Sequence, residues 1–226
     1  RFRTVSMPAR RPARTWVGVL AAAGSLALVA ACTRHLDDAT PTAGSIAAPI
    51  LTTQVADLLS PNVLGDEGNL FALVEPQRCA GLAREVDPPF IQAHRPLATD
   101  GGHWTTPDGA VYIEEMVAVY RYDFDAAAAL DLVRRTIDEC RDQTLTVTTM
   151  KDRTYLFDAS PGTAPQPQSG VLWQLRAVDW NCDNTFVAAH NAAVEITACG
   201  ESGGPGVADL AEEALARIEA LANTAA

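Results

Sequence analysis

The stretch WNCDNTFVAAHNAAVEITAC, from Trp180 to Cys199, predicts two strands joined by a tight turn. Small and β-branched residues lie on both sides of His190 and Asn191, which are the two turn residues of the predicted hairpin. In that register Cys182 faces Cys199 as a non-hydrogen-bonded pair, with alpha carbons about 4.5 Å apart. A disulfide accepts this spacing, so we expect a bond between these two cysteines.

Elements on both sides of the hairpin predict an α+β domain with a central antiparallel sheet and flanking helices. The expected elements are a short helix over Thr53–Leu59, a strand over Ala110–Tyr122, a helix capped by Asp123 or Asp125 and ending near Cys140, strands over Thr144–Thr149, Arg153–Asp158 and Val171–Asp179, and a helix from Pro205 to Leu221. Strands joined by short turns, with helices at the margins, are typical of this fold class.

The N-terminal region has the layout of a bacterial signal peptide. Arginines at Arg10, Arg11 and Arg14 precede an apolar run of 16 residues, which is short for a membrane span of roughly 18 to 20 residues. The run ends in Val-Ala-Ala before Cys32, which is similar to a lipobox, so we expect Cys32 to carry the lipid. An ordinary cleavage site, with Cys32 incidental, is the alternative.

We therefore divide the chain into three parts: a signal peptide over residues 1–31, a lipidated cysteine and flexible tether over 32–48, and a folded domain over 49–226. Within the first part, we expect the true start of the protein at Met7. The tether is rich in Ala, Thr, Pro, Asp and Gly, and sixteen flexible residues span roughly 22 Å. Two or three acyl chains would make such an anchor stable, whereas a single chain holds a protein weakly.

Four cysteines remain in the folded part, and an even number in an exported chain favours two disulfides. Since the hairpin pairs Cys182 with Cys199, Cys79 is left for Cys140. Each bond should stabilise the fold by roughly 3 to 4 kcal/mol. Zinc is the rival interpretation, but neither a Cys-x-x-Cys motif nor paired histidines accompany these cysteines. We expect no metal and no cofactor.

Composition excludes some classes of function. The chain of 226 residues is 48% hydrophobic, which is too apolar for a disordered tail, and its net charge is −11. Five of its 17 basic residues lie in the first 31 positions. Because the folded part is strongly acidic and would repel phosphate, we expect no nucleic-acid partner.

The chain resembles the family of PknH-like extracellular sensor domains, found in a mycobacterial serine/threonine kinase and in actinobacterial lipoproteins. The resemblance is carried by Trp180-Asn181-Cys182, His190-Asn191-Ala192-Ala193-Val194-Glu195-Ile196 and Ala198-Cys199, with weaker support from Pro76-Gln77-Arg78-Cys79-Ala80-Gly81 and from Phe124–Ala129. It covers roughly Val55 to Leu221 and implies a central antiparallel sheet, two disulfides and a cleft for an unidentified ligand. It implies no catalytic residues.

Alternation along the strands predicts where a ligand would bind. In the hairpin and in Ala110–Tyr122 the apolar residues share one face, which leaves Tyr112, Tyr120 and Glu195 on the other. Adding Arg176 from the neighbouring strand gives the mixture of aromatic surface and few polar groups that small-molecule clefts use. A plain solvated sheet face, or one covered by a helix, is the alternative.

One motif points to hydrolysis. Residues 199–205 are similar to the nucleophile loop of trypsin-like proteases, with Ser202 as the serine and His190 as the only nearby histidine. A catalytic triad needs the two within hydrogen-bond reach, but the predicted hairpin separates them by more than about 20 Å. We interpret the motif as a Gly-rich connector before a helix.

Other candidates have no catalytic or metal-ligating arrangement. His35 lies in the tether, and His94 and His103 lie in a loop-like region. Glu114 and Glu115 are adjacent on a strand and point to opposite faces, so they cannot act on one substrate.

We therefore expect a monomeric, non-catalytic ligand-binding or sensor domain, lipid-anchored on the outer face of the cell membrane. A structural or protein-interaction lipoprotein would offer a flat surface instead of a cleft. An envelope hydrolase would need a histidine, an acid and a nucleophile that converge.

Overall fold

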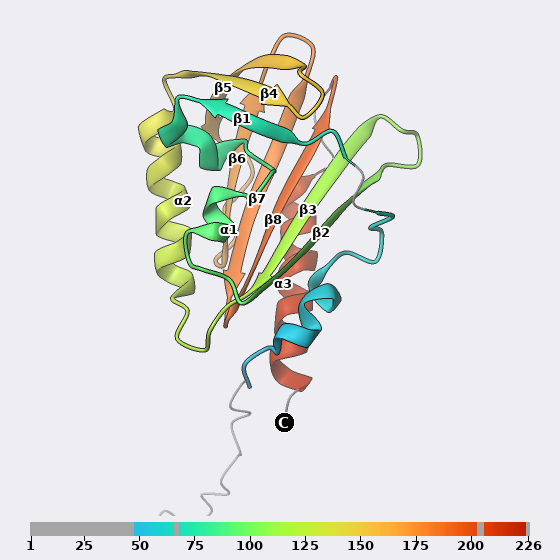
Figure 1. Cartoon of the computed structure of the whole chain (residues 1–226), viewed down its shortest axis with the longest axis vertical. Coiled ribbons are helices and arrows are strands. Elements are labelled where there is room, and N and C mark those ends of the chain that lie inside the picture. The colour runs from blue at the N-terminus through green and yellow to red at the C-terminus, as the bar shows by residue number, and fades with distance from the viewer. Residues whose placement is uncertain (1–47, 66–67, 203–205, 225–226) are drawn as a thin grey trace, which may run out of the picture. The chain divides into compact units, whose positions relative to one another are not determined.

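An eight-stranded antiparallel sheet organises the part of the protein that the computed structural model describes, residues 48–65, 68–202 and 206–224 (Figure 1). The strand order is β1-β4-β5-β6-β7-β8-β3-β2. The elements are η1 Thr52–Leu58, β1 Phe71–Glu75, η2 Gln77–Leu82, α1 Pro89–Gln92, β2 Ala98–Thr105, β3 Val111–Val119, α2 Ala126–Cys140, β4 Thr144–Thr149, β5 Thr154–Pro161, β6 Gly170–Arg176, β7 Asn181–Ala189, β8 Ala192–Gly200 and α3 Val207–Thr224. Cys32, the predicted signal peptide and nearly all of the predicted tether lie outside the described residues.

The predicted hairpin is confirmed residue by residue. β7 and β8 pair in the expected register, with Ala189 opposite Ala192 and Cys182 opposite Cys199. His190 takes a φ of 51°, in the left-handed region that His, Asn and Asp adopt more readily than other residues with side chains. The turn therefore forms without a glycine.

Asn191, the second turn residue, fastens the start of the domain to the hairpin. Its Oδ1 accepts a hydrogen bond from the Ile50 backbone N–H at 2.8 Å, and its Nδ2 donates to the carbonyls of Ile50 and Tyr120 at 2.9 and 3.0 Å. All three bonds are buried. The segment that enters the domain is thus fixed at the turn end of β7 and β8.

Both disulfides are confirmed. Cys182 and Cys199 bridge β7 and β8 with alpha carbons 4.1 Å apart, close to the predicted spacing. Cys79 and Cys140 join η2 to the end of α2 across 61 residues of sequence, with alpha carbons 6.0 Å apart.

Both faces of the central strands β6, β7, β8 and β3 are covered, whereas the alternation along the hairpin and Ala110–Tyr122 predicted only one core face. β4 and β5 alternate between buried and more exposed residues. α2, η2 and α1 cover the face toward the viewer in Figure 1, and α3 and η1 cover the opposite face. Almost every residue of β7 and β8 is buried. A strand covered on both faces reads as a near-continuous apolar run, and Phe186–Ala189 has that character.

The two long helices agree with prediction. The Asp125 carboxylate caps α2 by accepting a hydrogen bond from the Ala128 N–H at 2.9 Å, and the helix buries the face that includes Val133 and Ile137. α3 buries a stripe of small and aliphatic residues against the sheet, from Val207 to Ala222. The short helix expected near Thr53 is a 3-10 helix.

The front half contains elements that the sequence analysis missed. β1, η2, α1 and β2 all lie between Phe71 and Thr105. His103 is therefore a strand residue of β2 and not a loop residue, which corrects the expectation for it. Two adjacent glycines, Gly101 and Gly102, lower the strand propensity of β2, which forms because it pairs along its whole length with β3.

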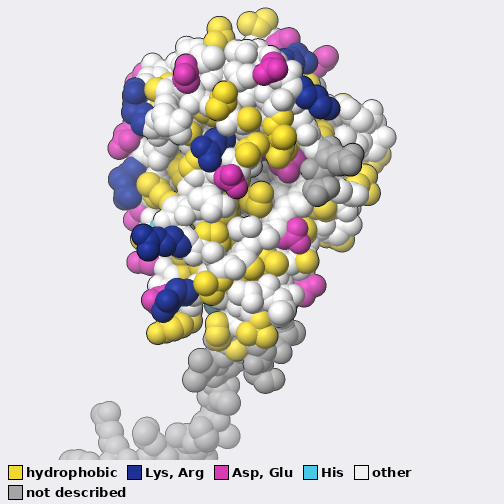
Figure 2. Space-filling model, viewed as in Figure 1, with side chains coloured by type: hydrophobic (Ala, Val, Ile, Leu, Met, Phe, Trp, Pro, Cys, Tyr) yellow, Lys and Arg dark blue, Asp and Glu magenta, His cyan; other side chains and the backbone are white. Residues whose placement is uncertain are grey.

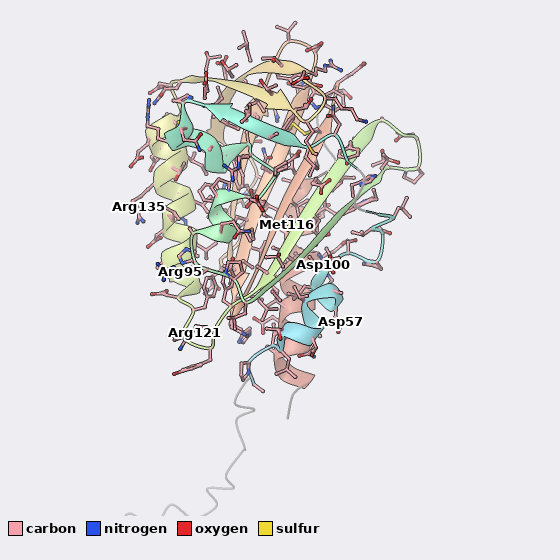
Figure 3. All side chains as sticks on the ribbon, viewed as in Figure 1. Asp57, Arg95, Asp100, Met116, Arg121 and Arg135 are labelled. Atoms are coloured by element: carbon pink, nitrogen blue, oxygen red, sulfur yellow. A yellow bond between two sulfur atoms is a disulfide. The ribbon has the colours of Figure 1, made fainter. Side chains whose placement is uncertain are left out.

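Side chains are distributed unevenly over the face shown in Figures 2 and 3. Lys and Arg gather along the side that carries α2, where Arg135 is labelled. Met116 of β3 lies nearer the middle of this face, next to the hollow described below.

Candidate ligand-binding site

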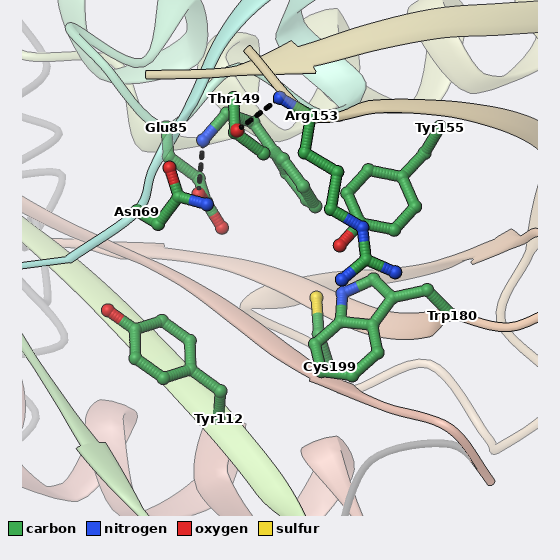
Figure 4. A pocket seen from close by; sticks show the side chains of 9 residues that line it. Asn69, Glu85, Tyr112, Thr149, Arg153, Tyr155, Trp180 and Cys199 are labelled. Atoms are coloured by element: carbon green, nitrogen blue, oxygen red, sulfur yellow. Dashed lines mark hydrogen bonds between the residues drawn. The ribbon is translucent and has the colours of Figure 1, made fainter. Parts of the chain in front are cut away.

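A cavity of about 250 Å³ opens where β1, β4 and β5 curl over the ends of β3 and β8 (Figure 4). It is lined by Phe71 of β1, Thr149 of β4, Tyr155 of β5, Tyr112 of β3, Cys199 of β8, and Asn69, Glu85, Arg153 and Trp180 from connecting segments. Residues far apart in sequence therefore meet around one hollow, which we call the outer pocket.

Aromatic rings form much of the outer pocket. Tyr155 lies between Phe71, at a centroid distance of 5.8 Å, and Trp180, at 6.3 Å. The Arg153 guanidinium lies 4.7 Å from the centre of the Tyr155 ring, and its Nη2 is 3.4 Å from a carboxylate oxygen of Asp179. The pocket thus combines flat apolar walls with one cation at its rim.

Glu85 supplies a carboxylate on the inner side of the outer pocket. Its Oε2 accepts a hydrogen bond from the Phe71 N–H at 2.7 Å, and its own N–H donates to the Phe71 carbonyl at 2.9 Å. Burial raises the pKa of Glu85 to about 7, and the hydrogen bond from Phe71 opposes this rise. Glu85 therefore titrates near neutral pH.

A smaller space of about 10 Å³ adjoins Glu85 on the sheet side, and we call it the inner chamber. It is lined by Glu85, Pro88, Glu114, Met116, Glu195 and Thr197. The Glu114 Oε2 accepts a hydrogen bond from the Tyr112 hydroxyl at 3.2 Å. Burial raises the pKa of Glu114 to about 8, and the charge of Glu85 contributes to the rise.

Glu195 is the third carboxyl group that lines the inner chamber. Its side chain is only 8% exposed, and its Oε2 has no hydrogen-bond partner among the described residues. Burial raises the pKa of Glu195 well above its usual value, and the negative charge of Glu85 adds to this. A buried polar atom without a partner calls for a water, an ion or a ligand group.

The structure brings together two of the four residues predicted to bind a ligand. Tyr112 and Glu195 lie on the same face of the sheet, at the outer pocket and the inner chamber. Tyr120 shares that face but is buried in the core, where its hydroxyl donates to the Ile91 carbonyl at 2.9 Å. Tyr120 and Tyr112 are eight residues apart along the chain, roughly 27 Å in an extended strand.

Arg176 lies on the opposite face, contrary to the expectation that it joined the same surface. It is opposite Asn181 in the β6–β7 pairing, forms an ion pair with Asp183, and donates to the Cys182 carbonyl at 2.7 Å. Its neighbour two residues earlier, Gln174, lines a hollow beside the start of α3. Arg176 is thus outside the pocket.

Sequence analysis missed several lining residues, namely Asn69, Phe71, Glu85, Thr149, Arg153, Tyr155 and Trp180. Trp180 was within reach of prediction, because it belongs to the motif that carries the family resemblance and lies next to the Cys182–Cys199 bond. Glu85 had no such signal, because its position depends on the fold of η2 over the sheet.

Other motifs are explained by the fold. Ser202 follows β8, whereas His190 precedes it and contacts Glu219 of α3 at 2.9 Å, so the length of β8 separates the two. Glu115 points away from the pocket and forms an ion pair with Arg217. Among the described residues, no three His, Cys, Asp or Glu side chains are grouped to hold a metal ion, and no helix is long and apolar enough to cross a membrane.

Comparison with known proteins agrees with this architecture. A family model described as the PknH-like extracellular domain matches residues 54–217. The crystal structure of the extracellular domain of PknH from Mycobacterium tuberculosis superposes with a TM-score of 0.60 at 16% sequence identity, covering 79% of this chain and 99% of that one. No curated protein matches the sequence.

Proposed function

The chain belongs to the family of PknH-like extracellular domains, and from this premise we propose that it is a lipid-anchored envelope protein whose folded domain binds a small ligand without catalysing a reaction. The outer pocket is the observation that carries the proposal. Its aromatic walls and few polar groups are typical of small-molecule sites. A purely structural lipoprotein would have no need of such a hollow.

The position of the pocket suits a protein tethered at its N-terminus. The chain enters the domain at Ile50, which is bound to Asn191 at one end of β8, while Cys199 lines the pocket at the other end. Cys199 is seven positions along the strand from Ala192, roughly 24 Å. The pocket therefore lies at the end of β8 away from the point where the chain enters the domain.

The hydrolase alternative has less support. Its only candidate serine and histidine, Ser202 and His190, lie beyond opposite ends of β8. Ser202→Ala should leave any envelope phenotype unchanged, and fluorophosphonate probes should not label the wild-type protein. Stoichiometric labelling of Ser202 would establish an enzyme instead.

The proposal is tested by native mass spectrometry of the full-length protein purified from its own envelope in mild detergent. We expect a small molecule to copurify with the wild-type protein. Trp180→Ala and Arg153→Ala should reduce the bound fraction several-fold, because both side chains line the outer pocket and neither is fully buried.

Tyr122→Ala is the matched control, because this tyrosine is 78% exposed and follows β3 at the end away from the pocket. It should retain the copurifying molecule. Equal retention by all three variants would place binding elsewhere, and absence of any bound molecule from wild-type protein would count against a ligand-binding function.

A further inference from the structure

We infer that the inner chamber receives the ammonium group of a cationic ligand, whose remaining part lies in the outer pocket; this inference rests on the proposed ligand-binding function. The chamber is lined by three carboxyl groups, those of Glu114 on β3, Glu195 on β8 and Glu85 in the segment after η2. The proposal therefore names the chemical class of the ligand as a primary amine with an apolar or aromatic body.

Strand pairing brings two of the carboxyl groups together. Glu114 of β3 is opposite Thr197 of β8, and Met116 is opposite Glu195, so Glu114 and Glu195 are diagonal neighbours on one face of the sheet. Such neighbours lie about 7 to 8 Å apart. The third carboxyl group, Glu85, approaches from the layer above, where β1 holds it through Phe71.

The nearby basic side chains are engaged elsewhere. Arg84 directs its guanidinium to the carbonyls of Val86 and Asp87, at 2.7 and 3.0 Å. Arg153 lies at the outer pocket, close to Asp179. Among the described residues, none of the three chamber glutamates forms an ion pair, so no basic group compensates their charge when they ionise.

One imidazole belongs to the surroundings of the chamber. His103 of β2 is opposite Glu114 in the β2–β3 pairing, and its ring stacks on Tyr112 at 5.1 Å. Its Nδ1 is buried without a hydrogen-bond partner. The titratable groups that face the chamber or its entrance are thus Glu85, Glu114, Glu195, Tyr112 and His103.

The size and donor pattern of an ammonium group match the chamber. The space is about 10 Å³, close to the room that one water molecule needs, and an ammonium group is of similar size. An ammonium has three N–H donors and no acceptor, whereas ionised carboxylates only accept. The unpartnered Oε2 of Glu195 is one acceptor that such a group would satisfy.

The outer pocket supplies what the rest of such a ligand needs. Tyr155, Trp180 and Phe71 offer ring faces and edges to an apolar or aromatic body, and an organic cation gains further from aromatic neighbours. A bare metal ion needs at least three His, Cys, Asp or Glu ligands at bonding distance at once, and the described side chains include no such group. An organic ammonium can instead combine one carboxylate with aromatic neighbours.

The raised pKa values give the inference a pH dependence. Burial raises the pKa of Glu85 to about 7 and that of Glu114 to about 8, so both carboxyl groups are largely protonated at pH 6. An ammonium binds the ionised form more strongly, so binding must tighten as pH rises and these protons leave. A neutral ligand would lack this dependence.

The test uses phenethylamine, which joins a primary ammonium to one aromatic ring, and its uncharged analogue 2-phenylethanol. Isothermal titration calorimetry is done with the full-length protein in detergent at pH 6 and pH 8. We expect phenethylamine to bind at least tenfold more tightly than the alcohol at pH 8, and about tenfold more weakly at pH 6 than at pH 8.

A matched pair of variants locates the interaction. Glu195→Gln keeps the shape of the side chain and removes its ability to ionise against the ammonium, and it should weaken phenethylamine binding about tenfold at pH 8. Glu212→Gln removes the same charge from an exposed position on α3, on the other side of the sheet, and should not change the affinity. Thermal unfolding establishes that both variants are folded.

Three outcomes would overturn the inference. Equal binding of amine and alcohol would leave the pocket as a site for neutral ligands. Failure of both probes to bind would exclude the amine class, while copurification of another molecule with the protein would still support the proposed function. Competition by Ca²⁺ that disappears in Glu195→Gln would identify a metal site instead.

Discussion

At the scale of single residues, two adjacent glutamates of β3 show how a strand gives identical side chains different roles. Glu114 faces the inner chamber, where its carboxyl group is close to Glu85. Glu115, on the other face, is 0% exposed, forms an ion pair with Arg217 of α3, and accepts a hydrogen bond from the Ser60 N–H at 3.1 Å. The second glutamate is therefore structural.

We predict that Arg217→Met lowers the free energy of unfolding by about 3 to 5 kcal/mol, because it leaves the buried carboxylate of Glu115 without its cation. Arg217 also donates to the Leu58 carbonyl at 2.7 Å, so η1 loses a contact with α3 as well. Urea denaturation measures the loss. The double variant Glu115→Gln/Arg217→Met should recover part of it, and a single variant as stable as wild type would contradict the role of the pair.

The chamber glutamates predict how stability depends on pH. Their folded-state pKa values, about 7 for Glu85 and about 8 for Glu114, lie above the usual 4.5, so the folded protein binds more protons than the unfolded chain between these values. The stabilisation is complete below about pH 4.5 and is lost as pH rises through 7 to 8. Glu114→Gln should remove about 2 to 4 kcal/mol of this pH-dependent change in the free energy of unfolding.

Denaturant titrations at pH 5, 6.5 and 8 measure the effect. The contribution of Glu114 should make the free energy of unfolding of the wild type higher at pH 5 than at pH 8. The slope of this free energy against pH should be shallower in Glu114→Gln. Glu212→Gln, an exposed change of equal charge, should keep the wild-type slope. Parallel slopes for all three proteins would mean that Glu114 is ionised throughout.

At the scale of the element, local patterns were sufficient for the hairpin and for α2. The hairpin is defined by two turn residues and a pair of cysteines, and α2 by its cap at Asp125 and its apolar spacing. β1 was not predictable in the same way, because its partner strand is β4, where Phe71 pairs with Thr149. Contacts between residues so far apart in sequence leave no periodic pattern near either residue.

The assignment of Arg176 failed for a related reason. The face on which a strand residue lies depends on register, and a shift of one residue moves every side chain to the opposite face. The pairing of Leu175 with Cys182 sets that register for β6, and nothing local to Val171–Asp179 specifies it. Within the hairpin the turn fixes the register, so Glu195 was assigned to the correct face.

The Cys79–Cys140 bond yields a prediction about the layer that holds Glu85. It closes a loop of 61 residues, and the loop-entropy model gives about 4 kcal/mol of stabilisation, compared with about 3 kcal/mol for the Cys182–Cys199 bond across 17 residues. Replacing Cys79 and Cys140 by alanine should therefore destabilise the protein more than replacing the hairpin pair.

Thermal and urea unfolding of the two double variants compares these losses. Non-reduced peptide mapping of the exported wild-type protein should recover both bonds and no free thiol among the four cysteines. A peptide that links Cys140 to Cys182 would contradict the pairing. A larger loss of stability in the variant without the Cys182–Cys199 bond would show that loop closure does not dominate the stabilisation by these disulfides.

At the scale of the whole molecule, the two ends of the central strands have separate tasks. One end receives the chain through Ile50 and Asn191, and the other forms the pocket with Tyr112 and Cys199. Between these ends, the central strands are covered on both faces by the domain's own helices.

In the proposed function, Cys32 is the residue that attaches the protein to the membrane. We predict that the mature protein begins at Cys32, incorporates radioactive palmitate and partitions into the detergent phase, because an apolar run and small residues precede this cysteine. Cys32→Ser should abolish labelling and release the domain from the membrane fraction without changing its thermal unfolding. Palmitate labelling and membrane retention that persist in Cys32→Ser would mean that another segment anchors the protein.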